Sequence, residues 1–226
     1  MPLHVKICGL TTLADAQVAI EAGADLLGFI LYPKSPRYCP PATVAAILAE
    51  LALATRPRTV GVFVNATAQE IDHILAATGL DLAQLHGDES PAVTAALAGR
   101  AYRALRTKPD DPILDLARPH LEWPHLGAPQ LLLDAYTPNA YGGTGWHADW
   151  TVASAVAQAV PRLLLAGGLT PENVQAAVAA VKPWGVDVSS GVEAAPGRKD
   201  HAKLRAFLHN ARAASNTTTT AMSSPA

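Results

Sequence analysis

Short apolar runs recur along the whole chain, and each is followed by a turn and then by a helix-like pattern. We predict eight strands, at Val5–Leu10, Leu26–Leu31, Thr59–Val64, Leu82–Leu85, Ala101–Arg106, Gln130–Ala135, Arg162–Ala166 and Gly185–Ser189. Strands that are almost continuously apolar are buried on both faces, as in a parallel sheet covered by helices. Eight strand–helix units in 226 residues favour a single-domain α/β fold, a closed (β/α)8 TIM barrel with parallel strands, over an open sheet.

Helix start and stop signals separate these runs. Thr12 and Asp15 have the spacing of a capping box, and Gly23 is placed to end the first helix. Ser90-Pro91 and Thr170-Pro171 each put a cap residue before a proline, which is typical of a helix start. We predict the first helix at Thr12–Ala22 and further helices at Pro41–Leu53, Thr67–Thr78, Asp149–Ala159 and Asp200–Ala213.

Two segments interrupt the pattern. Thr107–Pro129 carries five prolines, and only Pro112–Ala117 indicates a helix there. Ala214–Ala226 has no periodicity and almost no apolar mass, which is typical of a disordered segment. We therefore expect one catalytic barrel domain over residues 1–213 and a disordered C-terminal tail over residues 214–226.

Composition argues against several functional classes. The net charge is −2, and no run of lysine or arginine indicates a nucleic-acid partner. No apolar run reaches the roughly 18–20 residues of a membrane span, and the N-terminus lacks the pattern of a signal peptide. Two cysteines, Cys8 and Cys39, make no disulfide framework. We predict a cytoplasmic protein with no membrane or nucleic-acid partner.

Polar and glycine residues follow the predicted strands rather than precede them. They are Cys8, Arg37 within Pro33–Tyr38, His86 within His86–Asp88, Asp134, Tyr141–Gly145, Gly167-Gly168 and Ser189–Gly191. In barrels of this class the loops after the strands carry the active site, and the loops before them serve stability. A random scatter would rarely place all of these residues on one side, so we predict the functional site there.

The last two loops have the composition of a phosphate site. Gly167-Gly168 lets backbone N–H groups approach an oxyanion closely, and Ser189–Gly191 adds hydroxyls and further N–H groups. A phosphate held by the loops after strands seven and eight recurs in barrels. The alternative is that these glycines only turn the chain.

Three side chains have two interpretations each. Arg37, beside Lys34 and Tyr38, can fork onto a planar carboxylate, or it is an ordinary surface arginine. His86 binds a ligand or only satisfies a backbone carbonyl. Cys8 is a small buried hydrophobe or, with Asp134, half of a proton-transfer pair. Cys39, just before two prolines, is expected to pack.

Taken together, the motifs closely resemble those of phosphoribosylanthranilate isomerase, a barrel family of tryptophan biosynthesis. The matching segments are K-I-C-G-L-T at Lys6–Thr11, Y-P-K-S-P-R-Y at Tyr32–Tyr38, Q-L-H-G-D-E at Gln84–Glu89, L-L-D-A at Leu132–Ala135, Y-G-G-T-G at Tyr141–Gly145, A-G-G-L-T-P-E-N-V at Ala166–Val174, V-D-V-S-S-G-V-E at Val186–Glu193 and P-G-R-K-D at Pro196–Asp200. Single glycine pairs are weak signals, but this ordered set over about Leu3–Leu208 is highly specific.

The resemblance implies an Amadori rearrangement without a metal or cofactor. N-(5′-phosphoribosyl)anthranilate would become 1-(o-carboxyphenylamino)-1-deoxyribulose 5-phosphate. Cys8 would be the general base for the C2′ proton, and Asp134 the general acid for the ribose ring oxygen. Arg37 would hold the anthranilate carboxylate. The resemblance also assigns substrate binding to His86, Gly143, Gly167, Gly168, Asp187, Ser189, Ser190 and Gly191.

This chemistry places demands on two pKa values. A cysteine acts as a base only as the thiolate, so its usual pKa near 8.5 must fall somewhat at neutral pH. An aspartate acts as an acid only if burial raises its pKa from about 3.9. Lys6 precedes Cys8 by two residues, so strand alternation puts both on one face. We expect Lys6 to be an electrostatic partner of the thiolate.

Two other functions remain open at this point. A related phosphosugar barrel, the histidine-pathway isomerase, performs the same rearrangement, but it resembles a longer, two-phosphate barrel with an aspartate at the position of Cys8. A non-catalytic phosphosugar-binding barrel would keep the glycine and serine loops and need neither Cys8 nor Asp134. The sequence leaves the choice between monomer and homodimer open.

Overall fold

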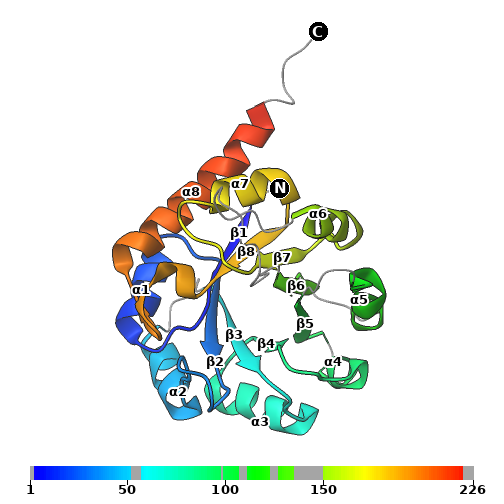
Figure 1. The fold of residues 1–226 in the computed structure, drawn as a ribbon. Helices are drawn as coiled ribbons and strands as arrows, with labels where there is room; N and C mark the ends of the chain where they lie inside the picture. Colours follow the sequence, from blue (N-terminus) through cyan, green and yellow to red (C-terminus); the bar gives the residue numbers. More distant parts are fainter. Residues whose placement is uncertain are drawn as a thin grey trace.

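Eight parallel strands close into a barrel, with neighbours hydrogen-bonded in chain order from β1 to β8 and back to β1 (Figure 1). The structure, a computed structural model, describes residues 3–51, 57–97, 99–106, 111–122, 127–134 and 150–220. The strands are β1 His4–Ile7, β2 Leu26–Ile30, β3 Arg58–Phe63, β4 Leu82–Leu85, β5 Ala101–Arg106, β6 Leu131–Asp134, β7 Leu163–Ala166 and β8 Gly185–Val188. The predicted (β/α)8 barrel is confirmed.

Helices surround the barrel, each following its strand (Figure 1). They are α1 Leu13–Glu21, α2 Pro41–Glu50, α3 Ala68–Thr78, α4 Pro91–Ala96, α5 Ile113–Leu121, α6 Trp150–Ala159, α7 Val174–Val181 and α8 His201–Thr220. Thr12 caps α1 by accepting a hydrogen bond from the Asp15 N–H over 3.2 Å, as its spacing predicts. The side chain of Asp15 does not complete the box, because it bonds to His201 and to the backbone N–H of Lys199.

α5 extends beyond the weak helix signal at Pro112–Ala117. Its buried residues Ile113, Ala117 and His120 lie four and then three positions apart, so they share one face against the barrel. Pro119 lies in the last turn of the helix and Pro112 just before its first residue. Pro112 costs the helix no hydrogen bond, because the first N–H groups of a helix have no partner within it, whereas Pro119 removes one near the C-terminal end.

The last unit of the chain also differs from expectation. α8 continues past Ala213, where the sequence predicted its end, to Thr220; residues 221–226 of the predicted tail lie outside the described residues. Between β8 and α8, a short 3-10 helix at Ser190–Val192 leads into an antiparallel hairpin of β9 Glu193–Ala195 and β10 Arg198–Lys199. This hairpin was not predicted, because strands of two and three residues leave no periodicity to detect.

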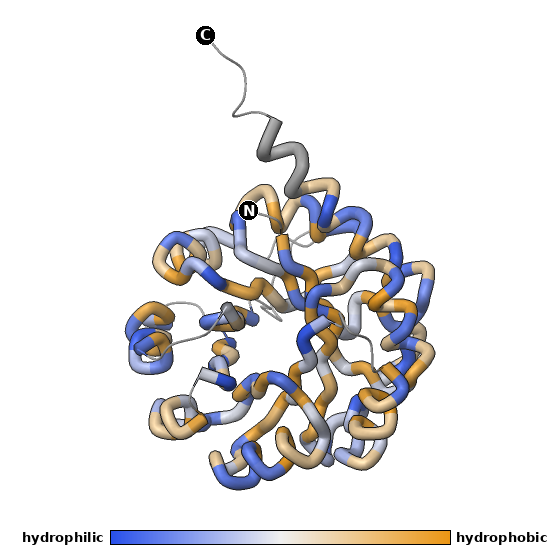
Figure 2. Tube along the Cα trace, turned by 180° about the vertical axis from the view of Figure 1, so that it is seen from behind, coloured by the Kyte–Doolittle hydropathy of each residue, from blue (hydrophilic) through white to orange (hydrophobic). Residues whose placement is uncertain are grey.

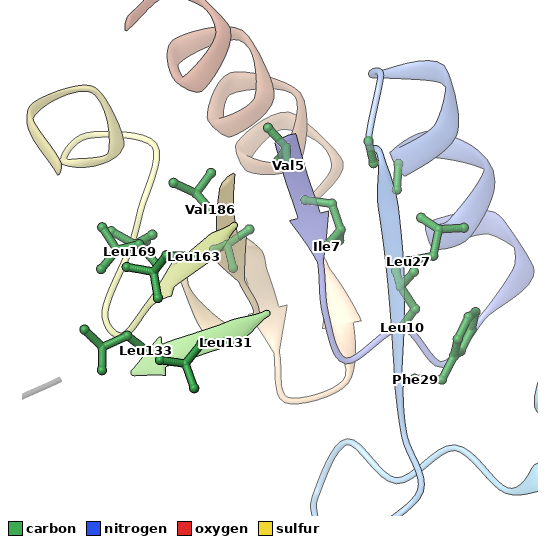
Figure 3. Close-up of a cluster of buried hydrophobic side chains, with 14 of the residues drawn as sticks. Val5, Ile7, Leu10, Leu27, Phe29, Leu131, Leu133, Leu163, Leu169 and Val186 are labelled. Atoms are coloured by element: carbon green, nitrogen blue, oxygen red, sulfur yellow. The ribbon is translucent and has the colours of Figure 1, made fainter. Parts of the chain in front are cut away.

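The alternation of side chains along each strand produces two buried layers. Outward-facing residues such as Val5, Ile7, Leu131, Leu133 and Leu163 pack beneath the helices (Figure 3). Inward-facing residues form a separate cluster inside the barrel: Leu26, Val60, Leu82, Tyr102, Ala104, Leu132, Leu164 and Ala166, with Ala128. Figure 2 shows the surrounding helices with hydrophobic and hydrophilic stretches alternating along the tube, as expected of helices that cover a core on one side.

The inward-facing positions also determine which residues reach the mouth of the barrel. Counting in steps of two, β1 leads to Cys8, β4 to His86, β6 to Asp134 and β8 to Ser189. All of these lie at the carboxyl ends of their strands. Within the described residues, no helix is long and apolar enough to cross a membrane.

Candidate active site

A cavity of about 1110 Å³ opens at the carboxyl ends of the strands. It is lined by the predicted site residues Cys8, Arg37, His86, Asp134, Gly167, Gly168, Asp187, Ser189, Ser190 and Gly191. Gly143, with the rest of the Tyr141–Gly145 loop, lies outside the described residues. The cavity is large enough for a small organic substrate, for which sites of about 300–1,000 Å³ are usual.

Cys8 lies in the cavity wall and is held closely by the neighbouring strand. Its backbone N–H donates to the Val188 carbonyl over 2.8 Å, and its side chain is 5% exposed. A Cβ on Gly28 of β2 would lie 2.8 Å from Cys8 Sγ and 3.1 Å from Lys6 Cε. Both side chains therefore occupy the space that the glycine leaves, on the same face of the sheet, as alternation predicts.

Opposing effects act on the Cys8 thiol. Burial raises its pKa and is the largest effect, whereas Lys6 and, more weakly, Lys199 favour the thiolate. Asp187 opposes them, and the resulting pKa is above the ordinary value. Lys6 is thus placed where it was expected, but its charge offsets only part of the cost of burying a thiolate.

At the floor of the cavity lies a buried polar layer of four residues, of which Gln84 and Asp187 line the cavity: Lys6, Gln84, Tyr102 and Asp187. Lys6 Nζ donates to Asp187 Oδ1 over 3.0 Å and to Gln84 Oε1 over 2.9 Å. Tyr102 Oη donates to the same Gln84 oxygen over 2.9 Å. A buried ammonium is tolerable only when paired and hydrogen-bonded, and these contacts meet both conditions. Asp187, predicted to bind substrate, therefore already has a protein partner.

Arg37 is oriented by an acidic partner from the unpredicted hairpin. Its Nε and Nη2 donate to the Glu193 carboxylate over 2.8 and 2.7 Å. Lys199 Nζ, also buried, lies 3.1 Å from Glu193 Oε1. Burial by itself raises the pKa of Glu193, but Arg37 and Lys199 together hold it below its usual value. The guanidinium thus keeps its Nη1 side for a second carboxylate, because Glu193 uses the Nε side.

The loop after β7 packs directly against the loop after β8. Gly167 and Gly168 both have positive φ, at 97° and 63°, which favours glycine. A Cβ on Gly191 would lie 1.9 Å from the Leu169 carbonyl oxygen, so the second loop also needs a glycine for close approach. Ser189 Oγ is buried, and the described part of the chain offers it no hydrogen-bond partner. Two glycine loops with a buried hydroxyl between them are suited to an oxyanion.

Asp134 and His86 lie on the other side of the cavity. Asp134 ends β6 and pairs in register with Arg106 of β5, which also lines the cavity. His86 follows β4, and its Nδ1 lies 2.9 Å from Gln84 Nε2. Burial, and then the positive charges of Arg106, Lys6 and Arg103, lower the pKa of His86 to about 4. The imidazole is therefore neutral at pH 7.

A cysteine and an aspartate line one cavity beside two glycine-containing loops, and comparison with known proteins shows to which family a chain with this site belongs. The model of the family described as N-(5′-phosphoribosyl)anthranilate (PRA) isomerase matches residues 5–210. The chain belongs to the N-(5′-phosphoribosyl)anthranilate isomerase family.

Individual members of the isomerase family match over nearly their whole length. The isomerase of Geobacter metallireducens is 47% identical over 211 residues, which are 93% of this chain and 100% of that protein. The crystal structure of the isomerase from Thermotoga maritima has a TM-score of 0.82 and 38% identity, covering 93% of this chain and 99% of the other. Another isomerase structure, in complex with reduced 1-(o-carboxyphenylamino)-1-deoxyribulose 5-phosphate, has a TM-score of 0.79 and 36% identity, with the same coverage.

Three contributors to this isomerase site were missed by the sequence reading. Gln84 belongs to a matching motif but was given no role, and Gly28 stood unremarked inside a strand. Glu193 was quoted only as the end of a motif. Strand alternation from His86 back to Gln84 was a usable signal, whereas the pairing of Glu193 with Arg37 depends on a hairpin that no pattern marked.

Proposed function

We propose that this chain converts N-(5′-phosphoribosyl)anthranilate into 1-(o-carboxyphenylamino)-1-deoxyribulose 5-phosphate, the Amadori rearrangement of tryptophan biosynthesis, by general acid–base catalysis. The observation that carries the proposal is the joint presence of Cys8 and Asp134 in one cavity of an isomerase-family barrel. A non-catalytic binding barrel needs neither residue. A histidine-pathway isomerase is disfavoured by the family match.

The reaction moves hydrogen within the substrate and changes no oxidation state overall. Asp134 gives a proton to the ribose ring oxygen, the C1′–O bond breaks, and the nitrogen lone pair forms the C1′=N bond of a Schiff base. Cys8 thiolate then takes the C2′ proton, and the electrons of that bond form C1′=C2′ while nitrogen recovers its pair. The resulting enolamine tautomerises to the C2′ ketone. General acid and base groups of this kind contribute about 10²–10⁴-fold each.

The remaining residues bind the two charged ends of the substrate. Arg37, held from one side by Glu193, offers its free side to the anthranilate carboxylate. Gly167, Gly168, Ser189, Ser190 and Gly191 receive the 5′-phosphate. His86, Asp187 and, from the loop outside the described residues, Gly143 complete the binding group. In this proposal the ribose lies between Cys8 and Asp134, where both proton transfers occur.

The test follows the loss of fluorescence of the anthranilate derivative when enzyme is added. Wild type should turn the substrate over, and Cys8→Ser and Asp134→Asn should each lose at least about 10²-fold in kcat. Cys39→Ser is the matched control, because Cys39 is equally buried but lies outside the cavity lining, and burial raises the pKa of its thiol to about 11. Unaltered turnover in both active-site variants would refute the mechanism, and wild type that binds without turnover would identify a binding barrel.

We infer a cytoplasmic location for this reaction and a protein that is a monomer or a homodimer. The two cysteines are free thiols, as is usual in a reducing compartment. Size-exclusion chromatography with light scattering distinguishes the two oligomeric states, and activity assays on the histidine-pathway substrate test for a second reaction.

A further inference from the structure

A row of hydrogen bonds at the floor of the cavity joins Lys6 and Tyr102, through the side chain of Gln84, to the ring of His86. Lys6 Nζ and Tyr102 Oη each donate to Gln84 Oε1 over 2.9 Å. The nitrogen of the same amide, Gln84 Nε2, lies 2.9 Å from His86 Nδ1. Lys6, Gln84 and Tyr102 are all buried, so solvent does not compete for these contacts.

The direction of every bond in this row follows from Lys6. An ammonium group carries only donors, so the Gln84 atom that faces it is the carbonyl oxygen. A flipped amide would set two donors against each other inside the barrel, away from any water that could satisfy them. Gln84 Nε2 therefore faces His86, and an amide nitrogen can only donate. Lys6 thus settles an orientation that is otherwise ambiguous between the two amide atoms.

His86 Nδ1 must accept this hydrogen bond. A neutral imidazole carries one N–H, so its proton then lies on Nε2. The neutral form is the relevant one, because burial and the nearby cations Arg106, Lys6 and Arg103 lower the pKa of the ring to about 4. The ring lines the cavity, and Nε2 is the ring nitrogen that Gln84 does not engage.

We propose that Gln84 is a positioning residue that holds His86 as the Nε2–H tautomer, so that His86 presents a hydrogen-bond donor to an acceptor oxygen of the substrate. Although Gln84 borders the cavity, both polar atoms of its amide are engaged by Lys6, Tyr102 and His86, so it acts through His86. The identity of the acceptor rests on the proposed function, whereas the tautomer is a property of the free protein.

The tautomer is measured directly in protein labelled with ¹⁵N-histidine, without substrate, at pH 7. Two-bond ¹H–¹⁵N correlation spectra distinguish a protonated ring nitrogen from an unprotonated one, and the His86→Gln variant assigns the signals among the eight histidines. We expect an unprotonated Nδ1 and a protonated Nε2. A dominant Nδ1–H tautomer, or an equal mixture, would overturn the proposal.

Two substitutions in this row of hydrogen bonds distinguish a role of Gln84 in positioning His86 from a role in packing alone. Gln84→Glu keeps the size of the side chain but presents only acceptors to His86, so the proton should move to Nδ1 or the ring should become doubly protonated. Tyr102→Phe removes one donor to Gln84 Oε1 but leaves Lys6 to hold the amide, so the Nε2–H tautomer should persist. Retention of Nε2–H in Gln84→Glu would overturn the proposal without any reference to activity.

The donor itself is tested by two replacements of His86. A glutamine side chain brings its amide N–H near the place of Nε2, and an asparagine brings it near the place of Nδ1. We expect His86→Asn to raise KM about tenfold, the cost of one lost hydrogen bond, with a smaller effect on kcat, and His86→Gln to recover most of that loss. Equal KM values for the two variants would contradict donation from Nε2. If wild type has the Nε2–H tautomer but no turnover, the proposed function fails and the tautomer assignment stands.

Discussion

Lys6 Nζ lies 3.0 Å from Asp187 Oδ1 at the base of the cavity, and the two side chains are only 0% and 8% exposed. β1 and β8 bring them together, because Lys6 and Asp187 are register partners across the closing seam of the barrel. Burial alone would lower the pKa of Lys6, but Asp187 raises it well above its usual value. Lys6 therefore stays charged beside Cys8, and the barrel closure itself supplies the positive charge that the base needs.

Lys6→Met should raise the pKa of the Cys8 thiol still further, because the largest effect that favours the thiolate is lost. The measurement is the rate of Cys8 alkylation as a function of pH, in a Cys39→Ser background that leaves one reactive thiol. An unchanged thiol pKa would contradict an electrostatic role for Lys6.

The same substitution leaves Asp187 buried without its partner. Removing one member of a buried ion pair typically costs about 3–5 kcal/mol in the free energy of unfolding. Urea denaturation measures this cost. Asp187→Asn in the Lys6→Met background should recover much of the stability, because no buried charge then remains, whereas activity should stay low.

The raised pKa of Cys8 sets the direction of the pH–rate profile. A base works in its deprotonated form, so kcat/KM should rise with pH above 7 and level off once the pH passes the thiol pKa of the free enzyme. Below that pKa each pH unit should cost about tenfold in kcat/KM. Stopped-flow assays between pH 6 and 10 provide the profile. A rate independent of pH across this range would be inconsistent with a buried thiol as the base.

Gly28→Ala should damage catalysis as well as stability. The added Cβ would lie 2.8 Å from Cys8 Sγ and 3.1 Å from Lys6 Cε, so both side chains must shift. Overpacking of this kind costs about 1–3 kcal/mol, and displacement of the base should lower kcat at least about tenfold. Gly61→Ala in β3 is the matched control, since its Cβ would meet Phe63, Leu31 and Leu80 instead. Equal kcat losses in the two variants would argue against a specific need for glycine beside Cys8.

The barrel was predictable because most strand residues are apolar and several helices carry a start or stop signal. Where those signals are weak, prediction falls short: prolines obscured α5, and the polar sequence beyond Ala213 concealed the last turns of α8. Strands as short as β9 and β10 do not show a recognisable alternation of apolar and polar residues. Local sequence determines elements that bury a face, and it says little about elements held by tertiary contacts.

The site was predictable to the extent that strand alternation determines it. Lys6 and Cys8 are two residues apart, and this spacing correctly indicated that they share a face. Contacts across the barrel, such as that between Lys6 and Gln84, join residues far apart in the chain and leave no local pattern. The pKa of Cys8 also depends on the balance between burial and the nearby charges, and only the folded geometry reveals this balance.

His86 should make the protein less stable in acid. Its pKa is near 6.5 when unfolded and about 4 when folded, so between these values the unfolded chain binds more protons. Stability should therefore fall as the pH drops from 6.5 to 4, by up to about 3 kcal/mol from this residue, and no further below pH 4. Urea denaturation at pH 7 and pH 4.5 should show a smaller loss for His86→Gln than for wild type. His73→Gln, on the exposed side of α3, should behave as wild type does.

Gly191→Ala should weaken phosphate binding selectively. Its Cβ would lie 1.9 Å from the Leu169 carbonyl oxygen, so the loops after β7 and β8 must separate. Backbone N–H groups aimed at one oxyanion then no longer converge, and the loss of one such charge-assisted hydrogen bond corresponds to about tenfold in affinity. Inhibition constants for inorganic phosphate and for anthranilate, measured on the same variant, separate the two ends of the cavity. Phosphate should bind about tenfold more weakly while anthranilate, beside Arg37, binds nearly as before; equal weakening of both would place the phosphate elsewhere.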